Sequence, residues 1–328
     1  MAEGIKITAS ASYLPPNVVN NDELSQIMDT SDEWIQAHTG IKTRHYAINE
    51  DSSTMATKVA QKILKQAQIG PEEIDLIIVS TISPDAFTPS TAALVQKNIG
   101  AVNAFAYDLS AACAGFVFAY ATVDKFLRSP QYHKALVISV EDNTKMLDFT
   151  DRTSAVFFGD GAAGVLVEKK ENAISSLLAE KLCTAGNMEA VNSGRVKPIS
   201  KVSADNYPHV KAFYQDGPAI FNFVTTTVIK HMHDFLQENN LSATDIDLVI
   251  PHQANLRLLE KISSALNIPF DKFAVNVTYA GNTSSVGIPL ALSECLEKGK
   301  RPHKALLTGF GAGLVYGSIL LDLSDYGK

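Results

Sequence analysis

The sequence predicts a layered α/β sandwich built from an internal duplication. Strand-forming and helix-forming segments alternate along the 328 residues, a pattern typical of layered α/β proteins with buried, largely parallel strands. The segment IDLIIVS at 74–80 resembles IDLVIPH at 246–252, and HKALVIS at 133–139 resembles HKALLTG at 303–309. Similar segments at matched spacing indicate a repeated structural unit.

The duplication divides the chain into two halves with a segment between them. We expect an N-terminal half over residues 1–172 and a C-terminal half over residues 216–328. Residues 173–215 match neither half and are rich in turn-forming residues, so we expect a variable insert or cap segment there.

Helices follow the strands in each half. NNDELSQIMDTSDEWIQAHTG predicts a capped helix near the start, and TMATKVAQKILKQAQIG predicts a periodic helix that ends at Gly70. Each half then has a small-residue turn before an apolar helix, at 114–127 and at 284–296. The helix at 114–127 is apolar nearly all round, which predicts burial on every side.

Composition and charge exclude several classes of protein. Hydrophobic residues at 46% and charged residues at 19% indicate a globular chain, and the net charge of −7 argues against nucleic-acid binding. No run approaches ~18 apolar residues, and the N-terminus lacks the features of a signal peptide. We therefore expect a cytoplasmic protein that binds neither nucleic acid nor membrane.

Three widely spaced cysteines, Cys113, Cys183 and Cys295, are expected to be reduced thiols, and no ligand spacing predicts a metal site. Cys113 lies in DLSAACAGF, between a predicted strand and the buried helix. The N–H groups and dipole of a helix start would stabilise a thiolate, which accepts an acyl group from a thioester. Taken alone, it is better explained as a buried structural cysteine.

Two residues of the C-terminal half fall at comparable junctions. His252 lies in VIPHQAN at the end of an apolar strand, and Asn282 lies in YAGNTSS. Such junctions gather where strand ends open into a crevice. Imidazole and amide groups can donate to a developing oxyanion, and imidazole can also act as a base. Singly, each is an ordinary polar or turn residue, but together they predict a constellation of Cys113, His252 and Asn282.

Two glycine-rich motifs have different interpretations. GFGAG at 309–313 lets backbone N–H groups approach a substrate oxygen, or simply forms a tight connection. FGDGAAG at 158–164 satisfies G-x-G-x-x-G, but VLVE follows it and predicts a strand where a dinucleotide site requires a helix. We therefore expect no NAD. Trp34 is the only tryptophan; it could stack a nucleotide base beside an arginine or simply be a packing residue.

The motifs AACAGF, PHQANLR, GNTSS, TDR with FGDGAAG, and GFGAG, in this order, resemble the β-ketoacyl-acyl-carrier-protein synthase III family. Its members are the initiating condensing enzymes of bacterial fatty acid synthesis. The resemblance covers nearly the whole chain and is weakest over 173–215. Thiolases use a second active-site cysteine and elongating synthases use Cys-His-His, whereas HQAN and GNTSS favour the branch primed by acyl-CoA. Plant-type polyketide synthases share the triad but usually have Pro where this chain has Ala312.

The resemblance implies a thiolase-like αβαβα fold, a homodimer, and an acyltransferase that uses acyl-CoA and malonyl-acyl carrier protein. It implies Cys113 as the acylated nucleophile, with His252 and Asn282 as donors to the malonyl thioester carbonyl. Loss of CO₂ would leave an enolate that attacks acyl-Cys113 and releases a 3-oxoacyl-carrier protein, so no metal or redox cofactor is expected. The N–H groups of Cys113 and Ala312 would hold the acyl oxyanion.

The resemblance also implies binding residues. Trp34 and Arg152 match the pair that sandwiches the adenine of CoA, and Arg257 matches the basic contact for the acidic helix of the carrier protein. The expected lining of the pantetheine tunnel is Gly217, Phe221 and Asn255.

Four positions depart from the family pattern. His38 and Asn222 replace common Arg and Lys residues, which reduces the positive charge near the expected docking region. Ala312 replaces a glycine that would adopt the loop geometry more cheaply. Thr88 occupies the position that gates the acyl pocket across the dimer, so we expect a roomier pocket than with Phe, unless Phe87 fills the gap.

Two alternatives remain open at this point. The first is an acyltransferase or condensing enzyme of specialised metabolism on the same fold, with an acceptor other than a carrier protein. The reduced basic charge favours it, while Arg257 and the complete triad oppose it. The second is a non-catalytic member that only binds acyl-CoA or a partner, which the intact Cys-His-Asn set opposes.

Overall fold

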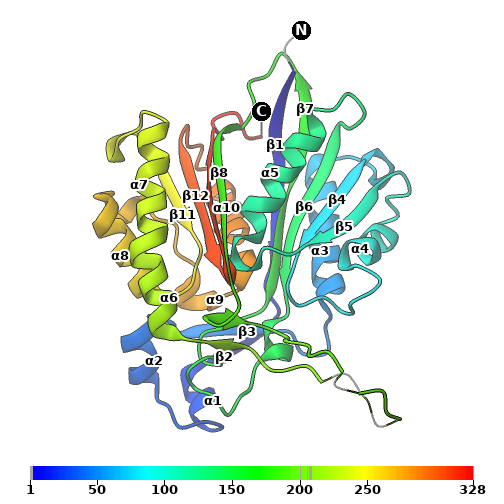
Figure 1. Ribbon diagram of the computed structural model, residues 1–328. Helices are drawn as coiled ribbons and strands as arrows, with labels where there is room; N and C mark the ends of the chain where they lie inside the picture. Colours follow the sequence, from blue (N-terminus) through cyan, green and yellow to red (C-terminus); the bar gives the residue numbers. More distant parts are fainter. Residues whose placement is uncertain (1–2, 200, 205, 207–208, 328) are drawn as a thin grey trace.

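The computed structural model describes residues 3–199, 201–204, 206 and 209–327, and it has five layers, with two β-sheets between three layers of helices (Figure 1). The helices of these layers are α3 (Ser52–Ala67), α4 (Thr91–Ile99), α5 (Gly115–Leu127), α10 (Gly287–Glu297), α7 (Ile229–Glu238) and α8 (Leu256–Leu266). One hydrophobic core joins α5 and α10 to both sheets, and separate cores pack α3 and α4 on the first sheet and α7 and α8 on the second. The predicted αβαβα sandwich is confirmed.

The two sheets have related strand orders, β1-β7-β6-β4-β5 and β11-β12-β13-β8. Both are mixed: β4 is parallel to β5 and β6, and β11 is parallel to β12, but the remaining pairs are antiparallel. The expectation of largely parallel strands was wrong here because no α-helix crosses over between β6 and β7 or between β12 and β13. The bounds are β1 (Glu3–Tyr13), β4 (Leu76–Ser80), β5 (Phe105–Leu109), β6 (Lys134–Glu141), β7 (Gly161–Glu171), β8 (Leu177–Asn187), β11 (Leu248–Pro251), β12 (Ala305–Gly311) and β13 (Gly313–Leu321).

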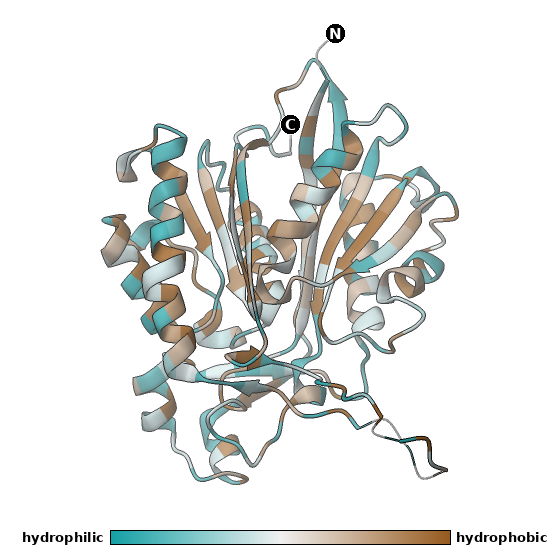
Figure 2. Ribbon diagram, viewed as in Figure 1, coloured by the Kyte–Doolittle hydropathy of each residue, from teal (hydrophilic) through white to brown (hydrophobic). Residues whose placement is uncertain are grey.

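Apolar residues concentrate on the strands and on the helices between the sheets (Figure 2). Phe116 and Tyr120 of α5 are completely buried, and Ile288 and Leu292 of α10 are buried with them. The prediction that the helix after Cys113 is buried on nearly all sides is therefore confirmed.

Matching hydrogen bonds mark the duplication. Asp75 accepts hydrogen bonds from the N–H groups of residues 133 and 134 at 2.7 and 3.0 Å. Asp247 accepts the same bonds from residues 303 and 304 at 3.0 and 2.9 Å. Asp75 precedes β4 and fixes the start of β6, and Asp247 precedes β11 and fixes the start of β12. The repeated sequence segments therefore form equivalent structures in the two halves.

One part of the predicted insert belongs to the core. Residues 177–187 form β8, which pairs with β13 in the second sheet as β1 pairs with β7 in the first. The prediction of an insert over 173–215 was wrong for this stretch. Its side chains alternate between half-buried and exposed, as in an edge strand with one solvent-facing side. Among its described residues, the later, turn-rich part has two short strands, β9 (Val191–Asn192) and β10 (Tyr214–Gln215), which pair with each other.

A smaller region lies beneath the sheets in Figure 1. It packs Trp34, Ile35 and Ile41 against Leu256 and Leu259 of α8. A π-helical turn, Val224–Val228, joins α6 to α7. The elements are β2 (Asn17–Asn20), α1 (Asn21–Ser25), α2 (Asp32–Thr39), β3 (Thr43–Tyr46), α6 (Gly217–Phe223) and α9 (Val277–Ala280).

The helix expected to end at Gly70 ends earlier, because Gln68 adopts a positive φ of 56° and its N–H closes the last turn of α3. Within the described residues, no helix is both long and apolar enough to cross a membrane.

Candidate active site

Cys113 lies in the 3-10 turn Ala112–Ala114, between β5 and α5. Its Sγ is 3.3 Å from Oγ of Ser284, which belongs to the C-terminal half. Gly311 lies directly behind the cysteine: a Cβ atom at Gly311 would be 2.9 Å from Cβ and 3.2 Å from Sγ of Cys113. The glycine is needed for this close approach, which brings the GFGAG motif against the nucleophile as the sequence predicts.

The Cys113 thiol is protonated at neutral pH. Burial raises its pKa to about 12, and the negative charge of Glu141 acts in the same direction, while the hydrogen bond with Ser284 lowers the pKa by less. The expectation that the helix start holds a ready thiolate is not supported, because the loss of solvent outweighs the favourable contacts. Proton transfer therefore has to accompany the attack of this sulfur on a thioester.

His252 follows β11 directly and is almost completely buried. Its backbone N–H donates to the Thr308 carbonyl at 2.8 Å, and its ring packs edge-on against Phe310 at 5.1 Å between centroids. Burial lowers the pKa of His252 to about 3, although an interaction with the Ser284 backbone opposes this effect. The imidazole is therefore neutral across the physiological range. Within the described structure its Nδ1 has no hydrogen-bond partner.

Asn282 is held from both sides. Its backbone N–H donates to the Phe157 carbonyl at 2.7 Å, and its carbonyl accepts from the Gly159 N–H at 3.1 Å. Its side-chain Oδ1 accepts from the Ser284 N–H at 2.9 Å. Because Oδ1 is occupied in this way, the amide is oriented to offer Nδ2 as a donor.

The hydrogen bond from the Gly159 N–H to Asn282 gives FGDGAAG a structural role. The strand predicted from VLVE is present as part of β7, which already begins within the motif at Gly161. The motif supports the asparagine loop.

A single turn connects the three predicted catalytic residues. Ser284 contacts Cys113 through Oγ, Asn282 through its N–H, and His252 through its backbone. Ser284 was not predicted as a functional residue, although it lies in the quoted GNTSS motif. The buried carboxylate of Glu141 was not predicted either, because its only signal in the sequence is an acid at the end of an apolar strand.

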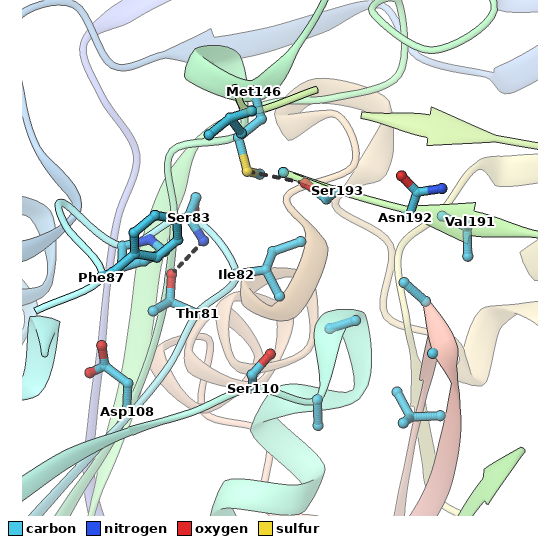
Figure 3. Close-up of a pocket in the computed structure, with 18 of the residues that line it drawn as sticks. Thr81, Ile82, Ser83, Phe87, Asp108, Ser110, Met146, Val191, Asn192 and Ser193 are labelled. Atoms are coloured by element: carbon cyan, nitrogen blue, oxygen red, sulfur yellow. Dashed lines mark hydrogen bonds between the residues drawn. The ribbon is translucent and has the colours of Figure 1, made fainter. Parts of the chain in front are cut away.

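A pocket of about 970 Å³ adjoins the nucleophile (Figure 3). Ala112 and Ala312 contribute to its lining, so it reaches the residues beside Cys113 and the predicted oxyanion hole. Phe87 lines this pocket and is 82% exposed, whereas Thr88 is exposed and absent from the lining. In the single chain Phe87, not Thr88, lines this pocket, and a gating role of Thr88 across the dimer stays a prediction. Further lining residues are Ile82, Met146, Met188, Val191 and Val210.

The predicted adenine-binding pair is brought together. The Arg152 guanidinium lies 5.3 Å from the Trp34 ring centroid and is fixed by a 2.6 Å hydrogen bond to the Asp29 carbonyl. The His38 ring stacks on Trp34 at 4.3 Å, and its Nδ1 lies 2.7 Å from the Trp34 carbonyl. His38 therefore extends the aromatic surface, and an inserted base would replace the direct contact between Arg152 and Trp34.

The other predicted contacts lie on α6 and at the start of α8. Gly217 begins α6, and Phe221 on the same helix is half exposed. Asn255 caps α8 by accepting from the Leu258 N–H at 2.9 Å. None of the three lines the pocket beside Cys113, so their place in a pantetheine tunnel stays a prediction.

Arg257 has structural partners. It donates to the carbonyls of Ala37 and Gln36, at 3.1 and 3.3 Å, near the end of α2. It also pairs with Glu260 at 3.2 Å, and its side chain is 47% exposed. Contact with a carrier protein stays a prediction for this residue.

A cysteine at the start of a central helix, linked through one turn to a histidine and an asparagine of the other half, defines a condensing enzyme of the thiolase-like fold. Comparisons agree. Family models of 3-oxoacyl-[acyl-carrier-protein] synthase III match residues 107–186, and its C-terminal region matches residues 236–323.

Among curated relatives, β-ketoacyl-[acyl-carrier-protein] synthase III 1 of Lactiplantibacillus plantarum is 56% identical over 96% of this chain and 98% of its own length. The solved structure of 3-oxoacyl-[acyl-carrier-protein] synthase III from Aquifex aeolicus has a TM-score of 0.89 at 38% identity, covering 97% of this chain and 100% of the other. The priming β-ketosynthase of the R1128 polyketide pathway has a TM-score of 0.89 at 29% identity, covering 98% and 97%. The chain belongs to the β-ketoacyl-acyl-carrier-protein synthase III family, an acyltransferase family of fatty acid biosynthesis.

Proposed function

We propose that this enzyme condenses an acyl-CoA primer with malonyl-acyl carrier protein, using Cys113, His252 and Asn282. The observation that carries the proposal is the Ser284 turn, which contacts all three residues and lies beside a pocket large enough for an acyl chain. Family membership supports the reaction class, and the relatives' names include the acyl carrier protein.

The first half-reaction loads the primer. The Cys113 sulfur attacks the acyl-CoA carbonyl, the bond from that carbon to the CoA sulfur breaks, and the thiol proton leaves with CoA. The backbone N–H groups of Cys113 and Ala312 would stabilise the negative charge on the carbonyl oxygen. The acyl chain would then extend into the pocket that Phe87 and Met146 line.

The second half-reaction forms the carbon–carbon bond. As CO₂ leaves the malonyl group, its bonding electron pair forms an enolate, whose oxygen accepts hydrogen bonds from His252 and Asn282. The enolate carbon attacks the acyl group on Cys113, the carbon–sulfur bond breaks, and the sulfur takes a proton from solvent. The neutral imidazole keeps one N–H group, so it can donate a hydrogen bond to the enolate oxygen without taking up a proton first.

We also propose a homodimer formed along β5. This strand is one of the two edges of the first sheet, and an unprotected apolar edge favours pairing with another chain. Phe105 on this strand is 36% exposed and packs with Tyr107, Phe126 and Tyr132, with centroids 5.2–6.3 Å away. Sedimentation should give a dimer for the wild type and a monomer for Phe105→Lys, and a monomeric wild type would contradict the proposal.

Intact mass measurement tests the reaction. Incubation with acetyl-, butyryl- or octanoyl-CoA should add one acyl group to the wild type and none to Cys113→Ala. Addition of malonyl-acyl carrier protein should then discharge the adduct as 3-oxoacyl-carrier protein. Failure to form any adduct would show that Cys113 is a structural cysteine.

A condensing enzyme of specialised metabolism is the second candidate. Arg257 is already bonded to α2 and Glu260, and His38 is stacked on Trp34, which leaves little fixed positive charge for a carrier protein. The similarity to a polyketide priming synthase points the same way. An adduct that malonyl-CoA discharges and malonyl-carrier protein does not would favour this candidate.

A further inference from the structure

Glu141, the last residue of β6, is completely buried behind the catalytic turn. No ion pair to this carboxylate occurs among the residues that the structure describes. Four hydrogen-bond donors compensate for its burial. Oε1 accepts from Ser285 Oγ at 2.7 Å, and Oε2 accepts from Ser83 Oγ at 2.6 Å, the Ile82 N–H at 3.1 Å and Thr81 Oγ1 at 3.4 Å. A buried carboxylate is tolerated only when such partners surround it.

The donors come from two turns with different positions in the site. Residues 81–83 line the pocket beside the nucleophile, as Figure 3 shows. Ser285 belongs to the turn Ser284–Val286, and Ser284 contacts Cys113 and Asn282. The two oxygens of one carboxylate therefore join the wall of the pocket to the turn that orients the catalytic residues.

The duplication shows that this arrangement is a modified copy of the nucleophile site. Cys113 and Ser285 are each the middle residue of a 3-10 turn that precedes a central helix. Each follows a residue with positive φ, 44° at Ala112 and 51° at Ser284. By alignment of the HKAL segments, Glu141 occupies the position of Gly311. Gly311 leaves Cys113 free to react, whereas Glu141 holds its counterpart Ser285.

We propose that Glu141 is a positioning residue that anchors the Ser284–Ser285 turn, and through it Asn282 and Cys113, to the wall of the acyl pocket. This role rests on the proposed function, because it serves the same condensation. Glu141 touches no reacting atom. It acts by fixing the turn whose hydroxyl and N–H groups set the positions of two catalytic side chains, and small displacements of such groups reduce the rate strongly.

Two variants cut this connection at different points. Ser285→Ala removes one hydroxyl and leaves the carboxylate with three donors. Glu141→Gln keeps the size of the side chain, but one oxygen becomes an NH₂ group that cannot accept from a turn. We expect each variant to lower kcat for condensation by about tenfold relative to the wild type. Its KM for acyl-CoA should stay within about twofold of the wild-type value. The double variant should be no slower than the slower single variant, because both changes break the same connection.

Glu168→Gln is the matched control. Glu168 is also a buried acid on a neighbouring strand, but it pairs with Lys170 at 3.2 Å and contacts neither turn. Its kcat should equal that of the wild type.

The wild type must form the Cys113 adduct and the 3-oxoacyl product in the same assays. If it does not, the proposed function fails. If the wild type is active and both variants keep its kcat, or if their losses multiply in the double variant, the positioning role alone is overturned. An equal loss in Glu168→Gln would also overturn it, since the effect would then follow from any buried acid. Ser285→Ala alone decides the question if Glu141→Gln does not fold.

Discussion

Replacement of His252 by alanine should lower kcat for condensation by about 100- to 1000-fold while Cys113 still accepts an acyl group. Removal of one preorganised donor to a developing oxyanion typically costs about that factor. The imidazole is buried and held by its backbone bond to Thr308, so its donor position is fixed before substrate binds. The measurement is single-turnover loading by intact mass, followed by the rate of 3-oxoacyl formation.

The pH dependence of the wild type gives the same prediction a second readout. Because burial lowers the pKa of His252 to about 3, the ring stays neutral as the pH falls from 8 to 6. Release of CO₂ from a preloaded enzyme should therefore not follow a titration near pH 6.5, where an exposed histidine would gain its proton. A rate that falls with a midpoint near 6.5 would show that the ring is accessible and titrates normally.

His233→Ala is the control for His252→Ala. His233 lies on α7 and its Nε2 is 3.1 Å from the Ala265 carbonyl, outside the candidate site. Its removal should leave kcat unchanged. If His252→Ala instead abolishes loading and leaves the decarboxylation rate intact, the ring acts on Cys113 rather than on the malonyl thioester.

The repeated segments were sufficient to predict a layered α/β sandwich because they form equivalent strands, and the family resemblance implied its five αβαβα layers. It also placed Cys113, His252 and Asn282 at junctions that the structure joins through Ser284. Such predictions work because strand ends and helix starts are local features, and the duplication places them at related ends of two sheets.

Other features depend on tertiary surroundings. The raised pKa of Cys113 comes from burial and from Glu141, which lies 28 positions away in the chain, and no local pattern predicts this. The strand β8 was not predicted from the sequence, because its residues alternate between half-buried and exposed positions and it lies next to a turn-rich stretch. Phe87 and Thr88 are neighbours, so only the loop geometry shows which of them faces the pocket.

Substitution of Gly159 by alanine should destabilise the protein and also impair catalysis. A Cβ atom at this position would lie 2.2 Å from the Ala280 carbonyl oxygen, which is backbone and cannot rotate away. Overpacking of this kind typically costs about 1–3 kcal/mol of unfolding free energy. The forced shift passes directly to Asn282, because its carbonyl accepts from the Gly159 N–H.

Denaturant unfolding and steady-state kinetics together separate the two effects of Gly159→Ala. We expect kcat to fall by about 10- to 100-fold under conditions where the variant remains folded, because the amide donor is displaced from the enolate. Gly186→Ala is the matched control: no atom lies within 4 Å of a Cβ there, so stability and kcat should both be retained. A Gly159→Ala enzyme that is destabilised but keeps wild-type kcat would show that FGDGAAG supports the fold without positioning Asn282. If stability and kcat both fall, FGDGAAG has two roles: it supports the fold and it positions Asn282. That result would explain why this glycine motif lies beside an asparagine rather than a dinucleotide.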